Sequence, residues 1–91
     1  MEVIYRRHAL QRMVERRIPR AAVLAALASG EVIREYPEDR PFASRLLMIW
    51  HAGEPLHVVA AFDAGAAVEY VITVYRPDPA EWSADFRRKQ P

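Results

Sequence analysis

The sequence predicts an α+β fold, in which an N-terminal helical hairpin packs on one face of a four-stranded antiparallel sheet. Three observations predict it: apolar residues recur at helical spacing before Gly30, strand-like runs follow it, and short turns separate the last runs. A chain of 91 residues has room for one core. We therefore expect a single domain over residues 1–91, divided into a helical hairpin (7–29), a sheet (31–76) and a C-terminal tail (77–91).

The first expected helix covers residues 7–17. Its apolar stripe, which we expect to face the core, consists of Leu10, Met13 and Val14. The polar side chains on the opposite side are those of His8, Arg12 and Glu15. Pro19 suits the first turn of a second helix, which runs through Ala28 and ends at Gly30, where we expect a left-handed cap.

The expected strands are residues 31–35, 45–50, 56–62 and 69–75. The run 56–62 is apolar on both alternating faces and is therefore placed in the centre of the sheet. A short hairpin loop precedes it, with Gly53 where a positive φ is expected. The last three strands form an antiparallel meander. The sheet face away from the helices is then partly open, used for binding, or covered by the tail, which Trp82 and Phe86 are able to pin back.

Composition excludes several classes of protein. The chain has no cysteine, which removes disulfides and thiolate chemistry and fits a reducing cytoplasm. Its longest apolar run, AAVLAALA, is far shorter than the roughly 20 residues that span a bilayer, so we expect no membrane association. Three isolated glycines make no phosphate loop, and three scattered histidines predict neither a metal site nor a cofactor.

The net charge of +1 is unevenly distributed. Residues 1–20 carry six arginines against Glu2 and Glu15, whereas residues 31–80 carry four arginines against eight acidic residues. A basic N-terminal element on an acidic body is able to bind a polyanion or an acidic partner. The alternative is a surface that is charged only for solubility.

His8 and Arg12 form the first candidate pair. They lie four residues apart on one helix face, where histidine transfers protons near neutral pH and arginine forks onto phosphate. Metal-independent RNA cleavage needs these two groups. The alternative is a solvated helix face on which Glu15 pairs with Arg12.

The sheet supplies the second group of candidates. His57 sits in the apolar central strand, where it is either a hydrogen-bonded structural histidine or, beside Tyr75 or Arg45 on the open face, an acid or base. Tyr75 is able to stack on a base while Arg76 binds phosphate. The alternative for this pair is a tyrosine at the sheet edge next to an exposed arginine, and Arg45 has the same ambiguity.

Four motifs carry a family resemblance: H-A-L-Q-R-M-x-E-R-x-I, G-E-V-I-x-x-Y-P, P-L-H-V-V and T-V-Y-x-P-D-P-x-x-W-x-x-D-F-R. Together they resemble the domain-of-unknown-function family 4258, a bacterial family of short proteins. That family is distantly similar to RelE/ParE/BrnT-like toxins and to compact RNase folds. The resemblance implies a RelE-like antiparallel sheet with an N-terminal helical pair. The chain departs from the family pattern at Ile49 and Ala43, which lie in the second strand and before it.

The toxin likeness implies which positions carry function. They are His8, Arg12, His57, Thr73 and Tyr75 in this sequence. RelE-type toxins also use basic residues near the chain end, which here are Arg87, Arg88 and Lys89.

Two functional hypotheses follow. The first is a toxin-like, metal-independent endoribonuclease, or an RNA-binding protein, that acts on RNA or the ribosome and is controlled by a small antitoxin. Its catalytic residues would be His8, Arg12, His57 and Tyr75, and its substrate-binding residues Arg45, Thr73 and Arg76. The second is a non-enzymatic homodimeric interaction module anchored by Trp50, Tyr75 and Trp82. The sequence leaves open whether the protein is an enzyme.

Overall fold

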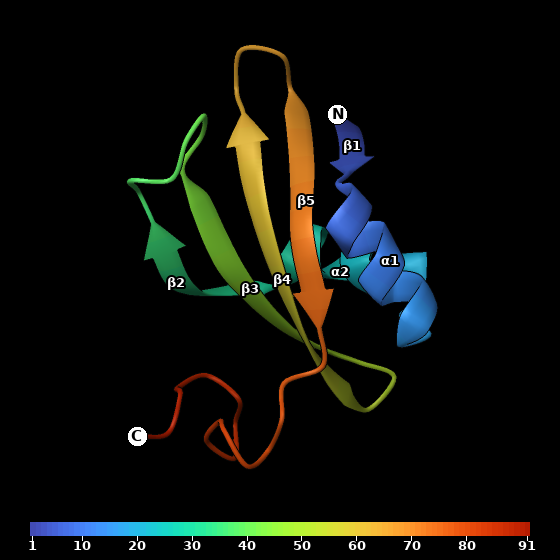
Figure 1. The fold of residues 1–91 in the computed structure, drawn as a ribbon, viewed down its shortest axis with the longest axis vertical. Coiled ribbons are helices and arrows are strands. Elements are labelled where there is room, and N and C mark those ends of the chain that lie inside the picture. Colours follow the sequence, from blue (N-terminus) through green and yellow to red (C-terminus); the bar gives the residue numbers. More distant parts are fainter.

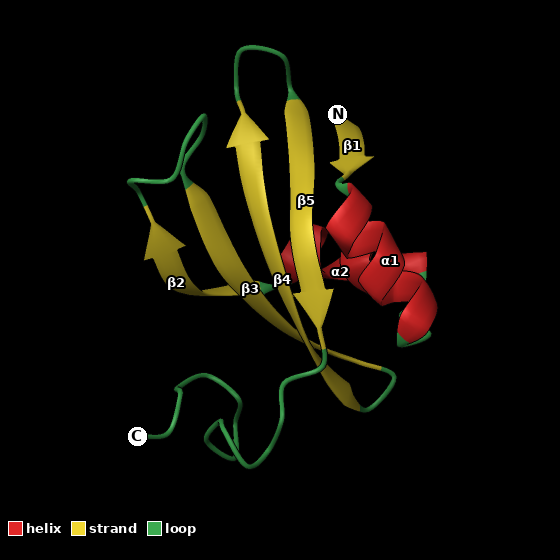
Figure 2. Ribbon diagram, in the orientation of Figure 1, coloured by secondary structure: helices red, strands yellow, loops and turns green.

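The computed structural model describes residues 1–91 as two helices and one five-stranded sheet (Figure 1). The elements in chain order are β1 (Glu2–Tyr5), α1 (Arg7–Glu15), α2 (Arg20–Ser29), β2 (Glu31–Tyr36), β3 (Ser44–His51), β4 (Glu54–Asp63) and β5 (Val68–Tyr75). The strand order is β1-β5-β4-β3-β2. Both helices lie on the same face of the sheet, α1 against β5 and α2 against β3 and β4 (Figure 2).

The prediction of four antiparallel strands is wrong, because the sheet has a fifth strand. The run EVIY forms β1, which pairs in parallel with β5, and the sheet is therefore mixed. With only four residues, β1 is too short to show a strand period. It forms because β5 offers a free edge and because Val3 and Tyr5 pack against the core. The other four strands and the antiparallel meander of β3, β4 and β5 are confirmed.

The helix ends differ from expectation in two places. α1 stops at Glu15, and Pro19 caps α2 from outside rather than occupying its first turn. Gly30 does not adopt the expected left-handed conformation, since its φ is −67° and its ψ is 154°. A glycine is needed there for another reason: a Cβ at this position would lie 2.5 Å from the carbonyl oxygen of Ala26. Gly53, by contrast, has the expected positive φ of 80° in the β3–β4 turn.

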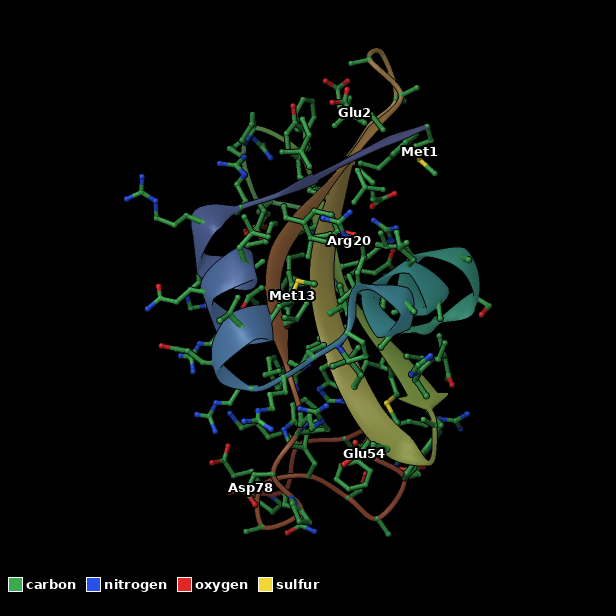
Figure 3. All side chains as sticks on the ribbon, turned by 90° about the vertical axis from the view of Figure 1, so that its right-hand side faces the viewer. Met1, Glu2, Met13, Arg20, Glu54 and Asp78 are labelled. Atoms are coloured by element: carbon green, nitrogen blue, oxygen red, sulfur yellow. The ribbon has the colours of Figure 1, made fainter.

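The face of α1 that meets the core is rotated from the expected one. Ala9 and Met13 are buried, and Met13 points from α1 toward the sheet (Figure 3). Leu10 and Val14 are 44% and 79% exposed, so their expected core positions are wrong. The small side chain of Ala9 lets α1 lie close to β5. This rotation leaves an apolar pair in solvent and brings Arg12, on the other flank of the helix, into a half-buried position.

The C-terminal tail covers part of the sheet face away from the helices, as expected from its aromatic residues. The Trp82 ring meets the His57 ring at a centroid distance of 4.5 Å, and the Phe86 ring meets Trp50 at 5.6 Å. Arg87 adds an ion pair with Glu31, at 2.6 Å. The tail runs across the end of the sheet where β5 finishes (Figure 1). Nearer the β4–β5 turn, Phe42 of the loop between β2 and β3 stacks on Tyr70 of β5.

Neither helix of the structure has the length and apolar character needed to cross a bilayer.

Candidate functional site

Two cavities lie beside β5, and α1 contributes to both. The first, which we call the Tyr70 cavity, has a volume of about 480 Å³ and is lined by Arg6, His8, Asp39, Arg40, Pro41, Phe42, Ala61, Tyr70 and Ile72. The second, which we call the arginine cavity, has a volume of about 500 Å³ and is lined by Arg12, Arg16, Tyr75, Arg76 and Asp78. Successive turns of one helix therefore contribute side chains to the two cavities.

The local fold explains why α1 reaches both cavities. His8, Arg12 and Arg16 are spaced by four residues and therefore lie along one side of the helix. β1 pairs only with Val68–Val71, so the rest of that edge of β5 has no strand beside it and α1 flanks it there. A bulge at this point, where the register of β4 and β5 shifts between Val59 and Ala60, re-aims the side chains of β5.

The arginine cavity is strongly basic. Neither Arg12 nor Arg16 forms an ion pair, and Asp78 is the single acidic residue in the lining. Nitrogen-bearing side chains gather between the end of α1 and Asp78 (Figure 3). An arginine that is half-buried and unpaired, as Arg12 is, offers its guanidinium fork to an anion.

Arg76 has a structural task within this cavity. Its guanidinium donates hydrogen bonds to the carbonyls of Arg16 and Arg17, which are free because α1 has ended. Its Nε also lies 3.6 Å from a Glu54 carboxylate oxygen. Arg76 therefore caps α1 and fixes it to the end of β5 while adding positive charge to the cavity wall.

Tyr75 is held from behind by His57. The Nε2 of His57 lies 2.8 Å from the Phe86 carbonyl oxygen, and its Nδ1 lies 3.1 Å from the Tyr75 hydroxyl. A carbonyl only accepts hydrogen bonds, so Nε2 carries the proton and Nδ1 accepts from the Tyr75 hydroxyl. Burial lowers the pKa of His57, against the opposing effect of the hydrogen bond to Phe86, and burial raises the pKa of Tyr75. At neutral pH the pair is a neutral histidine and a protonated tyrosine.

The structure brings some of the sequence candidates together and leaves others apart. Arg12, Tyr75 and Arg76 share the arginine cavity, and His8 lines the neighbouring Tyr70 cavity. His57 is fully buried and reaches the arginine cavity only through Tyr75. Thr73 lies on β5 between the two cavities, half-buried.

Arg45 lies elsewhere. It is on the helix-covered face of the sheet, in register with Ala60 of the core, and pairs with the buried Glu69 at 2.7 Å. Its guanidinium also lies 3.4 Å from the carbonyl oxygen of Ala60. These contacts indicate that Arg45 compensates a buried carboxylate.

Sequence reasoning missed most of the Tyr70 cavity. Its missed polar and aromatic lining residues are Arg6, Asp39, Arg40, Phe42 and Tyr70. The signal that was present is the charged, proline-bounded loop YPEDRPF between β2 and β3, which ends in an aromatic residue. Only the three-dimensional structure shows that side chains of this loop reach β5, where the Phe42 and Tyr70 rings are stacked with their centroids 6.0 Å apart.

A scan of protein families identifies the chain. The family model described as Domain of unknown function (DUF4258) matches residues 5–76, and the chain therefore belongs to this family. The match includes both helices and the last strand, and it ends where the tail begins. It also includes all seven residues that the sequence analysis assigned to catalysis or substrate binding. No curated protein and no solved structure matches the chain.

Proposed function

We propose that this member of the DUF4258 family binds single-stranded RNA across the two cavities beside α1 and cleaves it without a metal ion, as a toxin-type endoribonuclease. One observation carries the proposal: α1 presents His8, Arg12 and Arg16 on successive turns, and the opposite walls of the cavities carry Tyr70 and Tyr75. The resemblance of the family to RelE/ParE/BrnT-like toxins supports the toxin assignment.

The two cavities combine the groups that single-stranded RNA requires. Arginine side chains neutralise backbone phosphates, and aromatic rings receive bases that are not stacked in a duplex. Arg12 and Arg16 supply unpaired positive charge in one cavity, and Tyr70 supplies a ring in the other. A strand of RNA lying along α1 would therefore place a phosphate at the arginines and an adjacent base beside Tyr70.

The proposed chemistry is attack of a ribose 2′-oxygen on the adjacent phosphorus. The exposed imidazole of His8 takes the proton of the 2′-hydroxyl, and the guanidinium of Arg12 stabilises the charge on the five-coordinate phosphorus. The bond between phosphorus and the 5′-oxygen breaks, giving a 2′,3′-cyclic phosphate and a 5′-hydroxyl. The leaving oxygen takes a proton from water, and His8 releases its proton to solvent; Tyr75, whose hydroxyl donates to His57, contributes its ring as a stacking surface for a base. His57 is a positioning residue for Tyr75, and Thr73 and Arg76 complete the substrate-binding wall.

A small antitoxin is the proposed protein partner. Leu10 and Val14 form an exposed apolar pair on α1, on the flank opposite to the one that carries His8 and Arg12. A protein that covers this pair would bury apolar surface, and one that also wraps around α1 would obstruct the two cavities. The proposed target is free RNA or RNA on the ribosome.

Substitution of Arg12 and of His8 is expected to separate binding from cleavage. Arg12→Ala should weaken binding of a short labelled single-stranded RNA by about 10-fold, since one phosphate contact is lost. His8→Ala should leave binding nearly unchanged but slow cleavage by about 100-fold or more, because a general base is removed. Fluorescence anisotropy measures the first effect and gel analysis of the RNA measures the second.

Arg7→Ala is the matched control, because Arg7 is an exposed arginine of α1 outside both cavities. If Arg12→Ala binds RNA as tightly as the wild type and the Arg7→Ala control do, the RNA site is not where we place it. Intact RNA after long incubation with the wild-type protein, alone and with ribosomes, would rule out the nuclease.

A homodimeric module remains the second candidate, supported by one exposed aromatic residue. Trp50 is 54% exposed, whereas Trp82 is buried against His57 and Tyr75 lines the arginine cavity. Trp50 is thus the one expected anchor that is free to meet a second copy. If this function is correct, light scattering should show a dimer that Trp50→Ala converts to a monomer. A wild-type monomer at high concentration would eliminate this candidate.

A further inference from the structure

A base placed beside Tyr70 by the proposed RNA path enters the Tyr70 cavity, whose remaining lining is not used by the chemistry of His8 and Arg12. We propose that the Tyr70 cavity is a base-binding site that accepts an unstacked guanine of the RNA. The inference rests on the proposed function, because it takes the phosphate of the same nucleotide to lie near His8. It adds a substrate preference that the backbone contacts alone do not provide.

The size and lining of the cavity fit a nucleobase. Its volume of about 480 Å³ falls in the usual range for small-molecule sites, roughly 300–1,000 Å³. Its apolar lining comes from the sheet and the β2–β3 loop, at Pro41, Ala61 and Ile72. A few polar side chains converge on this apolar lining, which is the pattern of a site that orients a flat ligand.

The aromatic wall provides a stacking surface. The rings of Phe42 and Tyr70 are nearly parallel, at an interplanar angle of 10°. The guanidinium of Arg6 lies 5.2 Å from the centroid of the Tyr70 ring. A base that enters the cavity meets aromatic faces and a guanidinium plane, and these are the surfaces that receive unstacked bases in RNA-binding proteins.

Asp39 supplies the group that discriminates between bases. One of its carboxylate oxygens, Oδ2, accepts a hydrogen bond from the buried Ser44 hydroxyl, which fixes the carboxylate in place. The other oxygen, Oδ1, has no hydrogen-bond partner within the protein. A carboxylate only accepts hydrogen bonds, and guanine is the base whose Watson–Crick edge presents two neighbouring N–H donors.

Arg40 supplies the complementary donor. Its Nη1 lies 3.1 Å from the carbonyl oxygen of Asp39, which holds the guanidinium on the loop and leaves its other N–H groups free. Guanine places a carbonyl oxygen next to its N–H donors, so Asp39 and Arg40 together match its edge. Adenine and cytosine present an acceptor where Asp39 requires a donor, and uracil presents one donor only.

Titration with the four ribonucleoside 5′-monophosphates tests the inference. We expect the guanine nucleotide to bind at least about 10-fold more tightly than the other three, as one good bidentate contact would give. Two-dimensional NMR of the labelled protein should show shifts centred on residues 39–42 and 70–72. Equal affinities for the four nucleotides, or shifts that are absent from these segments, would overturn the proposal.

Asp39→Asn is the diagnostic variant. The amide retains an oxygen for the Ser44 hydroxyl but turns an NH₂ group toward the donors of guanine, so the preference should disappear while the fold is kept. Glu38→Gln is the matched control, because Glu38 is the neighbouring carboxylate on the same loop and does not line the cavity. If Asp39→Asn fails to fold, Tyr70→Leu takes its place and should weaken binding of every nucleotide by removing the stacking surface.

A parallel titration with single-stranded RNA keeps this inference separate from the proposed function. If RNA binds but the guanine nucleotide shows no preference, the base site is refuted and RNA binding stands. If the guanine nucleotide binds as expected and RNA does not, the base site stands and RNA is not the ligand.

Discussion

Trp82→Ala is expected to lower the free energy of unfolding by about 3–5 kcal/mol, the usual effect of removing a large buried aromatic side chain. Trp82 is 7% exposed, although it belongs to a tail that lies outside the segment matched by the family model. Its ring stands edge-on to that of His57 at an angle of 88°, and this contact helps to exclude water from the histidine. In a domain of this size, such a loss is a large fraction of the total stability.

Urea denaturation of the wild type and the variant measures this effect. Trp50→Ala is the control, since Trp50 lies on the same sheet face but is 54% exposed and should change stability by roughly 1 kcal/mol or less. A change for Trp82→Ala as small as that of the control would mean that the tail is only loosely attached. In that case His57 would be accessible to solvent and would again be a candidate acid or base.

Most of the fold could be predicted because its signals are local. The alternating or continuous apolar runs of β3, β4 and β5 are long enough to show a period, and Gly53 marks the turn between two of them. β1 escaped prediction because four residues carry no period and because its partner, β5, lies far away in the sequence. The rotation of α1 was also unpredictable, since it depends on how closely Ala9 approaches the sheet.

The candidate site likewise contains residues that could be grouped from the sequence and residues that could not. His8 and Arg12 could be grouped from helical spacing alone, and the structure places them on one side of α1. Arg45 could not be judged from its neighbours, because its partner Glu69 is on a different strand and only the sheet register brings them together. The Tyr70 cavity depends on contacts between the β2–β3 loop and Tyr70, which are far apart in the sequence and have no local signal.

Stability is expected to fall as the pH falls below about 6.5, and His57 is the expected cause. Burial lowers the pKa of His57 below its ordinary value of 6.5, so the unfolded chain binds a proton more readily than the folded one. The contribution of His57 is therefore complete above pH 6.5 and is lost as the pH falls toward the lowered pKa. For one proton, the slope is at most about 1.4 kcal/mol per pH unit.

Urea denaturation at several values between about pH 7.5 and pH 5 tests this expectation, with His57→Gln as the comparison. Glutamine still has an amide to donate to the Phe86 carbonyl but does not titrate, so the variant should be less stable at pH 7.5 and show a flatter pH dependence. The hydrogen bond from Ser83 lowers the pKa of Asp85 below its ordinary value of 3.8. Asp85 therefore stays ionised throughout the measured pH range and does not contribute to the slope. An unchanged slope in His57→Gln would place the titrating group elsewhere, and would remove the argument that a neutral His57 holds the Tyr75 hydroxyl at the wall of the arginine cavity.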